Sequence, residues 1–311
     1  MNAKEKIIKC LKNPKWILVF LNNRGLHFLN DKNYLSLLYK LETGRNLNLD
    51  NPILFNEKMQ WLKIHDRKDI YSMMVDKYEA KKYVGKIIGE KYIIPTLGIY
   101  DNFEDIDFDA LPKQFVIKCT HDSGGLVIVK DKSKLNVTSA KNKINKCLKK
   151  NFYWTGREWP YKNVKPRIIV EKYMTDENSS SMKDYKFFCF NGVPKIMYLS
   201  EGLENHKTAA MSFFDMNFEL VNCKRKDYKL LKYQPSKPRN FEKMKEFASL
   251  LSSGIPHLRV DFYEINGELF FGELTFYTNS GMIPFENEEW NYKMGEMLEL
   301  PKKKISDDNE K

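Results

Sequence analysis

Two apolar alternating runs joined by Asn266-Gly267 limit the possible folds of this chain more than any other feature. The stretch LRVDFYEINGELFFGELTFY occupies residues 258–277. An Asn-Gly pair between two such runs favours a two-residue turn between antiparallel strands, because both turn positions need positive φ angles. The chain is therefore expected to contain an antiparallel sheet that includes this hairpin.

Two carboxylates face each other in the predicted hairpin. Asp261 and Glu273 each lie six residues from Gly267, so the pairing places them nearly opposite one another. Both stand in apolar runs, where an unpaired carboxylate is costly to bury. Paired oxygen ligands suit Mg²⁺, which takes one or two carboxylates together with substrate phosphates. Arg259 shares the face of Asp261 and could hold an anionic intermediate; a surface strand with one polar face is the alternative interpretation.

A second candidate is the stretch FVIKCTHDSGG at residues 115–125. The ammonium of Lys118, at the end of an apolar run, can bind phosphate oxygens. Glycines at 124 and 125 would let backbone N–H groups approach the same phosphates. The pattern is neither a Walker A loop nor GxGxxG, and a tight turn between two strands remains an equal alternative. His121 taken alone is more typical of a structural turn residue.

Two later strands carry polar groups that need partners. PRIIVEKYM at 166–174 is an ordinary core strand by pattern, although its end could offer backbone groups to an adenine edge. DYKFFCFNG at 184–192 places Lys186 among acidic and aromatic residues. An interior lysine needs an anionic partner, and phosphate is one candidate.

Composition narrows the class of protein. The 311 residues are 42% hydrophobic, which predicts a folded chain with a sizeable core. A net charge of +11 suggests an anionic partner such as a nucleotide or an acidic sugar, although the lysines are spread along the whole chain. No arginine-rich tract or zinc-finger spacing points to nucleic acid. Five scattered cysteines fit a reduced cytoplasm, and no apolar run reaches the roughly 20 residues of a membrane span.

The periodicity predicts a helical beginning followed by mixed helices and strands, which indicates an α+β architecture. Helices are expected at 36–45, 51–63, 71–89, 138–153 (with Thr138 or Ser139 as N-cap), 241–253 and 286–298. Strands are expected at 92–100, 114–119, 126–130, 167–172, 184–190, 195–199, 209–214, 259–264 and 268–274.

Taken in order, these segments resemble the TupA-like ATP-grasp proteins of bacterial surface-polysaccharide gene clusters. The resemblance runs from NPILFNEKMQWLK (51–63) to NEEWNYKMGEMLELP (287–301). VDKY (75–78) resembles the first nucleotide-binding lysine region, and residues 115–125 resemble the second lysine strand with its glycine-rich phosphate loop. GREWPYKNVKPRIIVEKYM (156–174) resembles the approach to the adenine hinge, and residues 184–192 and 259–277 resemble the later nucleotide and metal strands.

This resemblance implies an ATP-grasp fold that uses ATP and Mg²⁺ and activates a carboxylate as an acyl phosphate for attack by an amine. It implies ATP contacts by Lys77, Lys118, His121, Ser123, Gly124, Gly125, Glu171, Lys172, Tyr173, Met174 and Lys186. Metal ligation falls to Asp261 and Glu273, with Thr275 and Asn279 as weaker candidates, and the catalytic cations are Arg259, Lys118 and Lys186. The expected division is a helical substrate-side region (1–90), a small subdomain with the phosphate loop (91–175) and a C-terminal subdomain with the metal hairpin (176–311).

Two positions depart from the family pattern. Asp122 stands where the loop usually has glycine, and its carboxylate would repel a triphosphate unless it points away. Thr275 stands where many ATP-grasp enzymes have a metal-binding asparagine. A hydroxyl is the weaker ligand, and Asn279 is a candidate replacement.

Several functions stay open at this point. The leading prediction is an ATP-dependent carboxylate–amine ligase that modifies an acidic sugar, sugar nucleotide or amino-acid component of a capsular or surface polysaccharide, in the cytoplasm or at the inner face of the membrane. A glycosyltransferase is an alternative, because DIDFD at 105–109 contains two overlapping DxD patterns. A sugar kinase on the same fold and a non-catalytic nucleotide-binding protein are the others.

Overall fold

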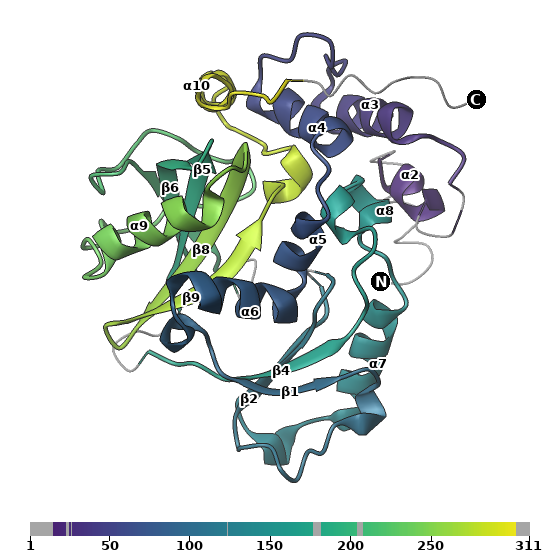
Figure 1. Cartoon of the computed structure of the whole chain (residues 1–311), viewed down its shortest axis with the longest axis vertical. Helices are drawn as coiled ribbons and strands as arrows, with labels where there is room; N and C mark the ends of the chain where they lie inside the picture. Colours follow the sequence, from purple (N-terminus) through teal and green to yellow (C-terminus); the bar gives the residue numbers. More distant parts are fainter. Residues whose placement is uncertain are drawn as a thin grey trace.

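Two antiparallel sheets organise the computed structural model, which describes residues 15–22, 25, 27–122, 124–176, 182–203 and 208–302 (Figure 1). The small sheet has the order β1-β4-β2-β3 and the large sheet the order β7-β6-β5-β8-β9. The strands are β1 (Thr96–Tyr100), β2 (Phe115–Cys119), β3 (Leu126–Val129), β4 (Ile168–Lys172), β5 (Asp184–Phe190), β6 (Val193–Glu201), β7 (Ala210–Phe214), β8 (His257–Ile265) and β9 (Glu268–Thr275).

Helices cover the sheets and join them. They are α2 (Lys15–Asn22), α3 (Asp31–Thr43), α4 (Phe55–His65), α5 (Ile70–Val75), α6 (Lys77–Ile88), α7 (Val137–Leu148), α8 (Tyr153–Gly156), α9 (Phe241–Ser252) and α10 (Glu289–Met297). Short 3-10 turns lie at Glu90–Tyr92, Phe103–Asp105, Lys132–Lys134, Trp159–Tyr161 and Thr278–Gly281. In Figure 1, α7 lies beside the small sheet, α9 beside the large sheet, and α5 and α6 run between the two.

Each sheet has its own core. Every residue of β5 is buried, because this strand lies in the middle of the large sheet and α9 packs against it. Phe187 and Phe188 on this strand are fully buried, and each such side chain contributes about 1.5–3 kcal/mol relative to an exposed one. A second core lies between the small sheet and α7, where Ile117 and Ile144 meet.

The predicted hairpin is confirmed as β8 and β9. Asn266 and Gly267 at its turn have φ angles of 52° and 80°, the positive values that an Asn-Gly turn supplies. The register pairs Asp261 with Glu273, as the sequence spacing predicted, and an irregularity follows directly after Asp261. The two carboxylates therefore lie on adjacent strands at the same level of the sheet.

Two helix predictions were wrong in detail. The single helix expected over 71–89 is two helices, because Asp76 has extended backbone angles and accepts hydrogen bonds from the N–H groups of Tyr78 and Glu79 at 2.8 and 3.1 Å. The N-cap of α7 is Asn136, not Thr138 or Ser139, and its side chain accepts from the Ser139 N–H at 2.9 Å. Asp76 lies inside the predicted helix 71–89, and Asn136 lies just before the predicted helix 138–153. Each side chain accepts hydrogen bonds from the first N–H groups of its helix.

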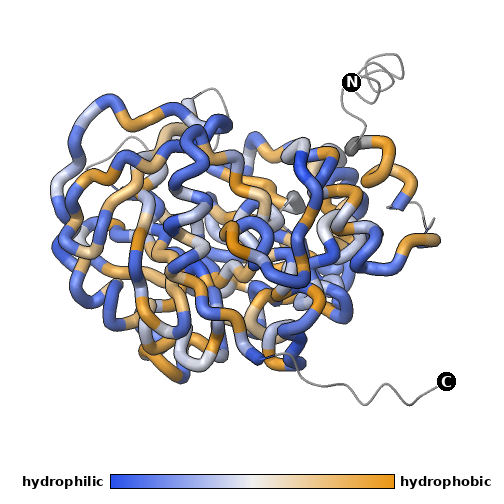
Figure 2. The backbone as a smooth tube through the Cα atoms, turned by 90° about the horizontal axis from the view of Figure 1, so that it is seen from above, coloured by the Kyte–Doolittle hydropathy of each residue, from blue (hydrophilic) through white to orange (hydrophobic). Residues whose placement is uncertain are grey.

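Hydrophobic and hydrophilic stretches alternate along the described part of the backbone rather than gathering into one long apolar segment (Figure 2). Consistently, none of the helices in the described part of the chain has the length and apolar character to cross a membrane.

Candidate active site

A cavity of about 410 Å³ opens between the small sheet and the large sheet. The small sheet contributes Val116, Lys118, Leu126, Ile128 and the segment from Glu171 to Met174, and the large-sheet side contributes Met182, Asp184, Gly202, Leu203, Thr208 and Tyr263, with Ile94 closing one end. All four residues of the predicted adenine hinge, together with Lys118, therefore line one space. Its apolar walls and few polar groups are typical of a small-molecule site.

Glu171 on β4 is the centre of a buried charge cluster. Its carboxylate is 2.5 Å from the Lys118 Nζ and also accepts from Lys81 on α6. Burial raises the pKa of Glu171, but Lys118 and Lys81 outweigh burial and lower it to about 2. Lys81 also donates to the carbonyl of Ile94 at 2.7 Å. Sequence reasoning missed Lys81, because a lysine on an amphipathic helix is expected to face solvent.

A second cluster lies on the large sheet. Lys186 on β5 is 2.6 Å from Asp261 and 3.1 Å from Asp184. Arg259 holds Asp261 through two hydrogen bonds of 2.7 Å each, from Nε to Oδ1 and from a terminal nitrogen to Oδ2. Burial raises the pKa of Asp261, but Arg259 and Lys186 together hold it below the usual range. The fixed fork of arginine makes this a rigid, charge-assisted contact.

Glu273 on β9 is the more open carboxylate of the predicted metal pair. Its side chain is 39% exposed, and its neighbours are distant: Lys77 at 3.8 Å, Arg259 at 3.9 Å and the Thr275 hydroxyl at 3.5 Å. Thr275 also accepts from Arg259 at 2.9 Å. Asn279 lies in the turn beyond β9 and donates its amide to the carbonyl of Met282 at 2.6 Å. Thr275 is thus beside Glu273, whereas Asn279 is engaged in its own turn.

The donor set fits one Mg²⁺ only with help from a ligand. Asp261 accepts three hydrogen bonds, two of them at Oδ2, which leaves about one of its four lone-pair sites, on Oδ1. Glu273 keeps most of its capacity. No group of three or more His, Cys, Asp or Glu side chains within the described ranges could bind a metal. Such a site suits Mg²⁺, which usually completes its shell with water and substrate phosphates.

Asp184 lines the candidate site but was not among the site residues predicted from the sequence. It is only 8% exposed and lines the cavity, and its Oδ1 has no hydrogen-bond partner among the described residues. Burial raises the pKa of its carboxyl. A buried acceptor at a cavity wall is ready to receive a ligand hydroxyl or amine. The signal was present in the sequence, because Asp184 lies two positions from Lys186 on one face of a strand.

Hydrogen bonds of Asp122 and His121 hold the glycine loop in place. Asp122 is 6% exposed, and its Oδ1 accepts the Gly125 N–H at 2.9 Å, so the carboxylate is used inside the loop. His121 places Nε2 3.2 and 3.1 Å from the carbonyls of Cys147 and Lys150, at the end of α7. The ring therefore anchors the loop to α7 and faces that helix. Ser123, predicted to close over phosphate, lies outside the described residues.

Lys77 connects this loop to β9. Its Nζ donates to the carbonyl of Asp122 and is 3.8 Å from Glu273. Its backbone N–H donates to the carbonyl of Thr120 at 3.0 Å, which ties the start of α6 to the end of β2. The lysine thus stands where the glycine loop of the small sheet approaches the large sheet.

A strained turn follows β9 and contacts the site through Thr278, which accepts from Arg259 at 3.1 Å. Asn279 and Ser280 have φ angles of 52° and 53°, unusual for residues other than glycine. Lys63, fully buried on α4, donates to the Ser280 carbonyl at 2.8 Å and to the Gly156 carbonyl at 2.7 Å. This buried lysine offsets the strain, and sequence reasoning gave it no role.

In the DIDFD stretch, the carboxylates of Asp105 and Asp107 accept hydrogen bonds within their own turns. Asp105 accepts from the Asn102 N–H at 3.2 Å, and Asp107 accepts from the N–H groups of Asp109 and Ala110 at 3.0 and 3.3 Å. These carboxylates cap their own turns. The DxD pattern therefore has a local structural explanation.

Comparison with known proteins identifies the family. Residues 57–299, more than half of the chain, match the profile of the TupA-like ATP-grasp family. None of the curated proteins matches the sequence significantly. Among solved structures, D-alanine–D-alanine ligase from Helicobacter pylori shares 15% identity over 78% of this chain and 69% of its own, with a TM-score of 0.42.

Two further solved structures contain nucleotides. The D-alanine–D-alanine ligase from Bacillus anthracis complexed with ATP shares 15% identity over 66% of this chain and 54% of its own, with a TM-score of 0.38. The ATP-grasp ligase PsnB, complexed with Mg and ADP, shares 9% identity over 67% of this chain and 50% of its own, with a TM-score of 0.35. The chain spans only about half the length of these two proteins. The family match carries the identification: the α+β arrangement is an ATP-grasp fold, and the chain belongs to the TupA-like ATP-grasp family.

Proposed function

We propose that the protein is an ATP-dependent carboxylate–amine ligase that modifies an acidic sugar or amino-acid component of a bacterial capsular or surface polysaccharide. One observation carries the ATP-dependent part of this proposal. Lys118 and Glu171 of the small-sheet cluster line one cavity together with Asp184, and Asp184 pairs at 3.1 Å with Lys186 of the Lys186–Asp261–Arg259 cluster on the large sheet.

The proposed binding mode follows from the charges. The hinge residues Glu171–Met174 and the apolar walls hold the base of ATP, and Asp184 accepts a hydroxyl of the nucleotide sugar. Lys77, Lys118 and Lys186 neutralise the phosphates as point charges. Glu273 and the free lone pair of Asp261 would hold Mg²⁺, which when bound would supply positive charge to the phosphates of ATP.

The chemistry then needs positioning rather than a protein nucleophile. The substrate carboxylate attacks the terminal phosphate of ATP, which gives an acyl phosphate and ADP. An amine attacks the acyl carbon and phosphate leaves. Arg259 is locked onto Asp261 and directs its remaining positive charge at the oxygens where negative charge develops. Because its partners hold it in place before substrate arrives, little reorganisation is needed.

The net charge of +11 supports the acidic-sugar part of the proposal, as do the surface-polysaccharide gene clusters of the proteins that the sequence resembles. A sugar kinase would use the same nucleotide site. A glycosyltransferase is disfavoured, since the DxD carboxylates cap their own turns.

Hydroxylamine separates these functions. The protein is incubated with ATP, Mg²⁺, candidate uronic acids or their sugar nucleotides, and hydroxylamine. A ligase releases ADP and forms an acyl hydroxamate, whereas a kinase releases ADP and forms a phosphosugar without hydroxamate. Consumption of the sugar nucleotide without ADP would indicate a transferase. Failure of ATP to bind at all would reject the whole proposal.

A further inference from the structure

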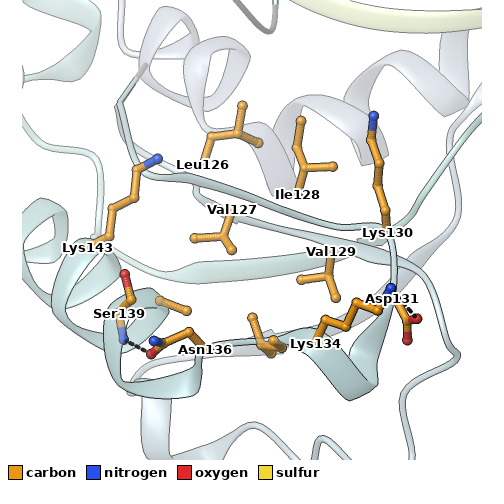
Figure 3. Close-up of a pocket in the computed structure, with 12 residues that line it drawn as sticks. Leu126, Val127, Ile128, Val129, Lys130, Asp131, Lys134, Asn136, Ser139 and Lys143 are labelled. Carbon is orange, nitrogen blue, oxygen red and sulfur yellow. Dashed lines mark hydrogen bonds and ion pairs between the residues drawn. The ribbon is translucent and has the colours of Figure 1, made fainter.

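The outer edge of the small sheet carries an open groove that the ATP site does not use. It has a volume of about 860 Å³ and runs between β3 and the segment that leads from the end of β3 into α7 (Figure 3). Its floor is apolar, with Val127, Val129, Leu135 and Ala140, and its rim carries Lys130, Lys134 and Lys143. Leu126 and Ile128 border both this groove and the nucleotide cavity.

On this side the backbone of β3 is unpaired at Ile128 within the described part of the chain, whereas the N–H of Leu126 donates to the Gly124 carbonyl at 3.1 Å. Among the described strands, β3 pairs only with β2. The Cys119 N–H donates to the Gly125 carbonyl at 2.8 Å, and the register continues from that pair, so Val127 and Val129 direct their backbone groups at β2. Ile128 therefore directs its N–H and C=O outward, and no hydrogen bond to them occurs within the described residues.

The two faces of the groove differ in chemistry. Figure 3 shows Ile128 and Lys130 projecting to one side of β3, with the amino group of Lys143 reaching toward the same side, while Val127 and Val129 project to the other. The acidic member of the rim is Asp131, and its Oδ1 accepts from the Ser133 N–H and hydroxyl at 3.1 and 2.8 Å. The rim is thus basic on balance.

We propose that this groove binds an extended acidic peptide segment of a partner protein, which adds a strand to β3. Main-chain hydrogen bonds to an exposed sheet edge supply affinity in such complexes, and alternate side chains supply specificity. Here an alternating acidic and apolar segment would direct its carboxylates at Lys130 and Lys143 and its apolar side chains at Val127 and Leu135. A peptide is favoured over an acidic polysaccharide, because the outward N–H and C=O of Ile128 match a peptide backbone.

The test uses the full chain and a fluorescent peptide of alternating Glu and Val. Fluorescence anisotropy is expected to show saturable binding that weakens as salt rises. An alternating Lys and Val peptide and a peptide with every backbone nitrogen methylated should bind at least tenfold more weakly. Equal binding of the methylated peptide would overturn strand addition. Tighter binding of a polygalacturonate oligomer than of the peptide would overturn the choice of partner.

Charge reversal locates the site. Lys130→Glu together with Lys143→Glu should weaken binding of the Glu-Val peptide at least tenfold. The matched control reverses Lys40 and Lys195, two exposed lysines on α3 and β6, and so makes the same change in net charge; its affinity should stay within twofold. Similar losses in both double variants would show only a general charge effect and overturn the proposal. No binding by the unmodified chain would also overturn it. The lysines would then serve only to prevent edge-to-edge association at β3.

Discussion

Glu273 is the carboxylate on which the proposed metal binding most depends, because Asp261 is already held by Arg259 and Lys186. We predict that Glu273→Gln weakens Mg²⁺-dependent ATP binding at least tenfold, since the amide loses the charge that the ion needs. Calorimetry with and without Mg²⁺ measures this. Glu268→Gln, on the same strand but exposed at the hairpin turn, is the matched control. Unchanged affinity in the Glu273 variant would remove this residue from the metal site.

Because of Glu171, the free energy of unfolding should depend on pH in the acid range. Its pKa is about 2 in the folded protein and near 4.5 in the unfolded chain, so the carboxylate contributes fully above about pH 4.5 and loses its contribution as pH falls toward 2. The difference corresponds to about 3 kcal/mol. Urea unfolding at pH 6 and pH 3 should therefore show a larger acid loss in the wild type than in Glu171→Gln. Parallel losses in the two proteins would contradict the role of this cluster.

Asp122 stands where the family's loop usually has glycine, and in the structure its carboxylate makes a contact within the loop. Its carboxylate holds the Gly125 N–H, and a Cβ at Gly125 would come within 2.5 Å of the Cys119 sulfur, so the loop is tightly packed there. We predict that Asp122→Gly releases the loop and weakens ATP binding several-fold. Asp122→Asn keeps the acceptor and should retain most of the affinity, which calorimetry can compare. Tighter ATP binding by the glycine variant would show instead that the carboxylate repels phosphate.

At the scale of elements, Asp76 decides where α6 begins. It caps the helix and its second oxygen pairs with Arg167 at 2.9 Å, so Lys77 is held at the first turn beside the phosphate loop. We predict that Asp76→Ala costs about 2 kcal/mol of unfolding free energy, from the lost cap and the lost ion pair. Asp76→Asn keeps the cap and should cost about half as much. Denaturant unfolding measures both, and equal costs would assign the effect to Arg167 alone.

The elements show where sequence reasoning succeeds. The bounds of β5 were predicted to the residue, and the β8–β9 hairpin with its facing carboxylates followed from an Asn-Gly turn, because such signals are local. The break at Asp76 was missed, since an acidic residue inside an apolar period looks like part of the polar face. Lys81 and Lys63 were missed because their burial depends on contacts with β4 and with the turn after β9, which are far away in sequence. The division of the chain near residues 90 and 175 stays a prediction.

At the scale of the whole molecule, the candidate site belongs to neither sheet alone. Lys118 and Glu171 come from the small sheet, Asp184 and Lys186 from the large one, and the cavity lies between them. A ligand that touches both sheets stabilises both, because local opening of either one breaks contacts with it. ATP should therefore stabilise the small sheet and the large sheet together, and not one of them alone.

Hydrogen exchange tests whether ATP stabilises both sheets. We predict that saturating Mg²⁺-ATP slows amide exchange in β2 and β4 and also in β5 and β8, by up to about a hundredfold at a concentration 100 times the dissociation constant. Glu273→Gln, at the same nucleotide concentration, should show protection lowered at least about tenfold in both sheets together, because the proposed metal contact is on β9 whereas the proposed hinge is on β4. Protection confined to β2 and β4 in the wild type would place the nucleotide on the small sheet alone. The large-sheet cluster of Lys186, Asp261 and Arg259 would then be a structural network, because a ligand in contact with it could not leave β5 and β8 unprotected.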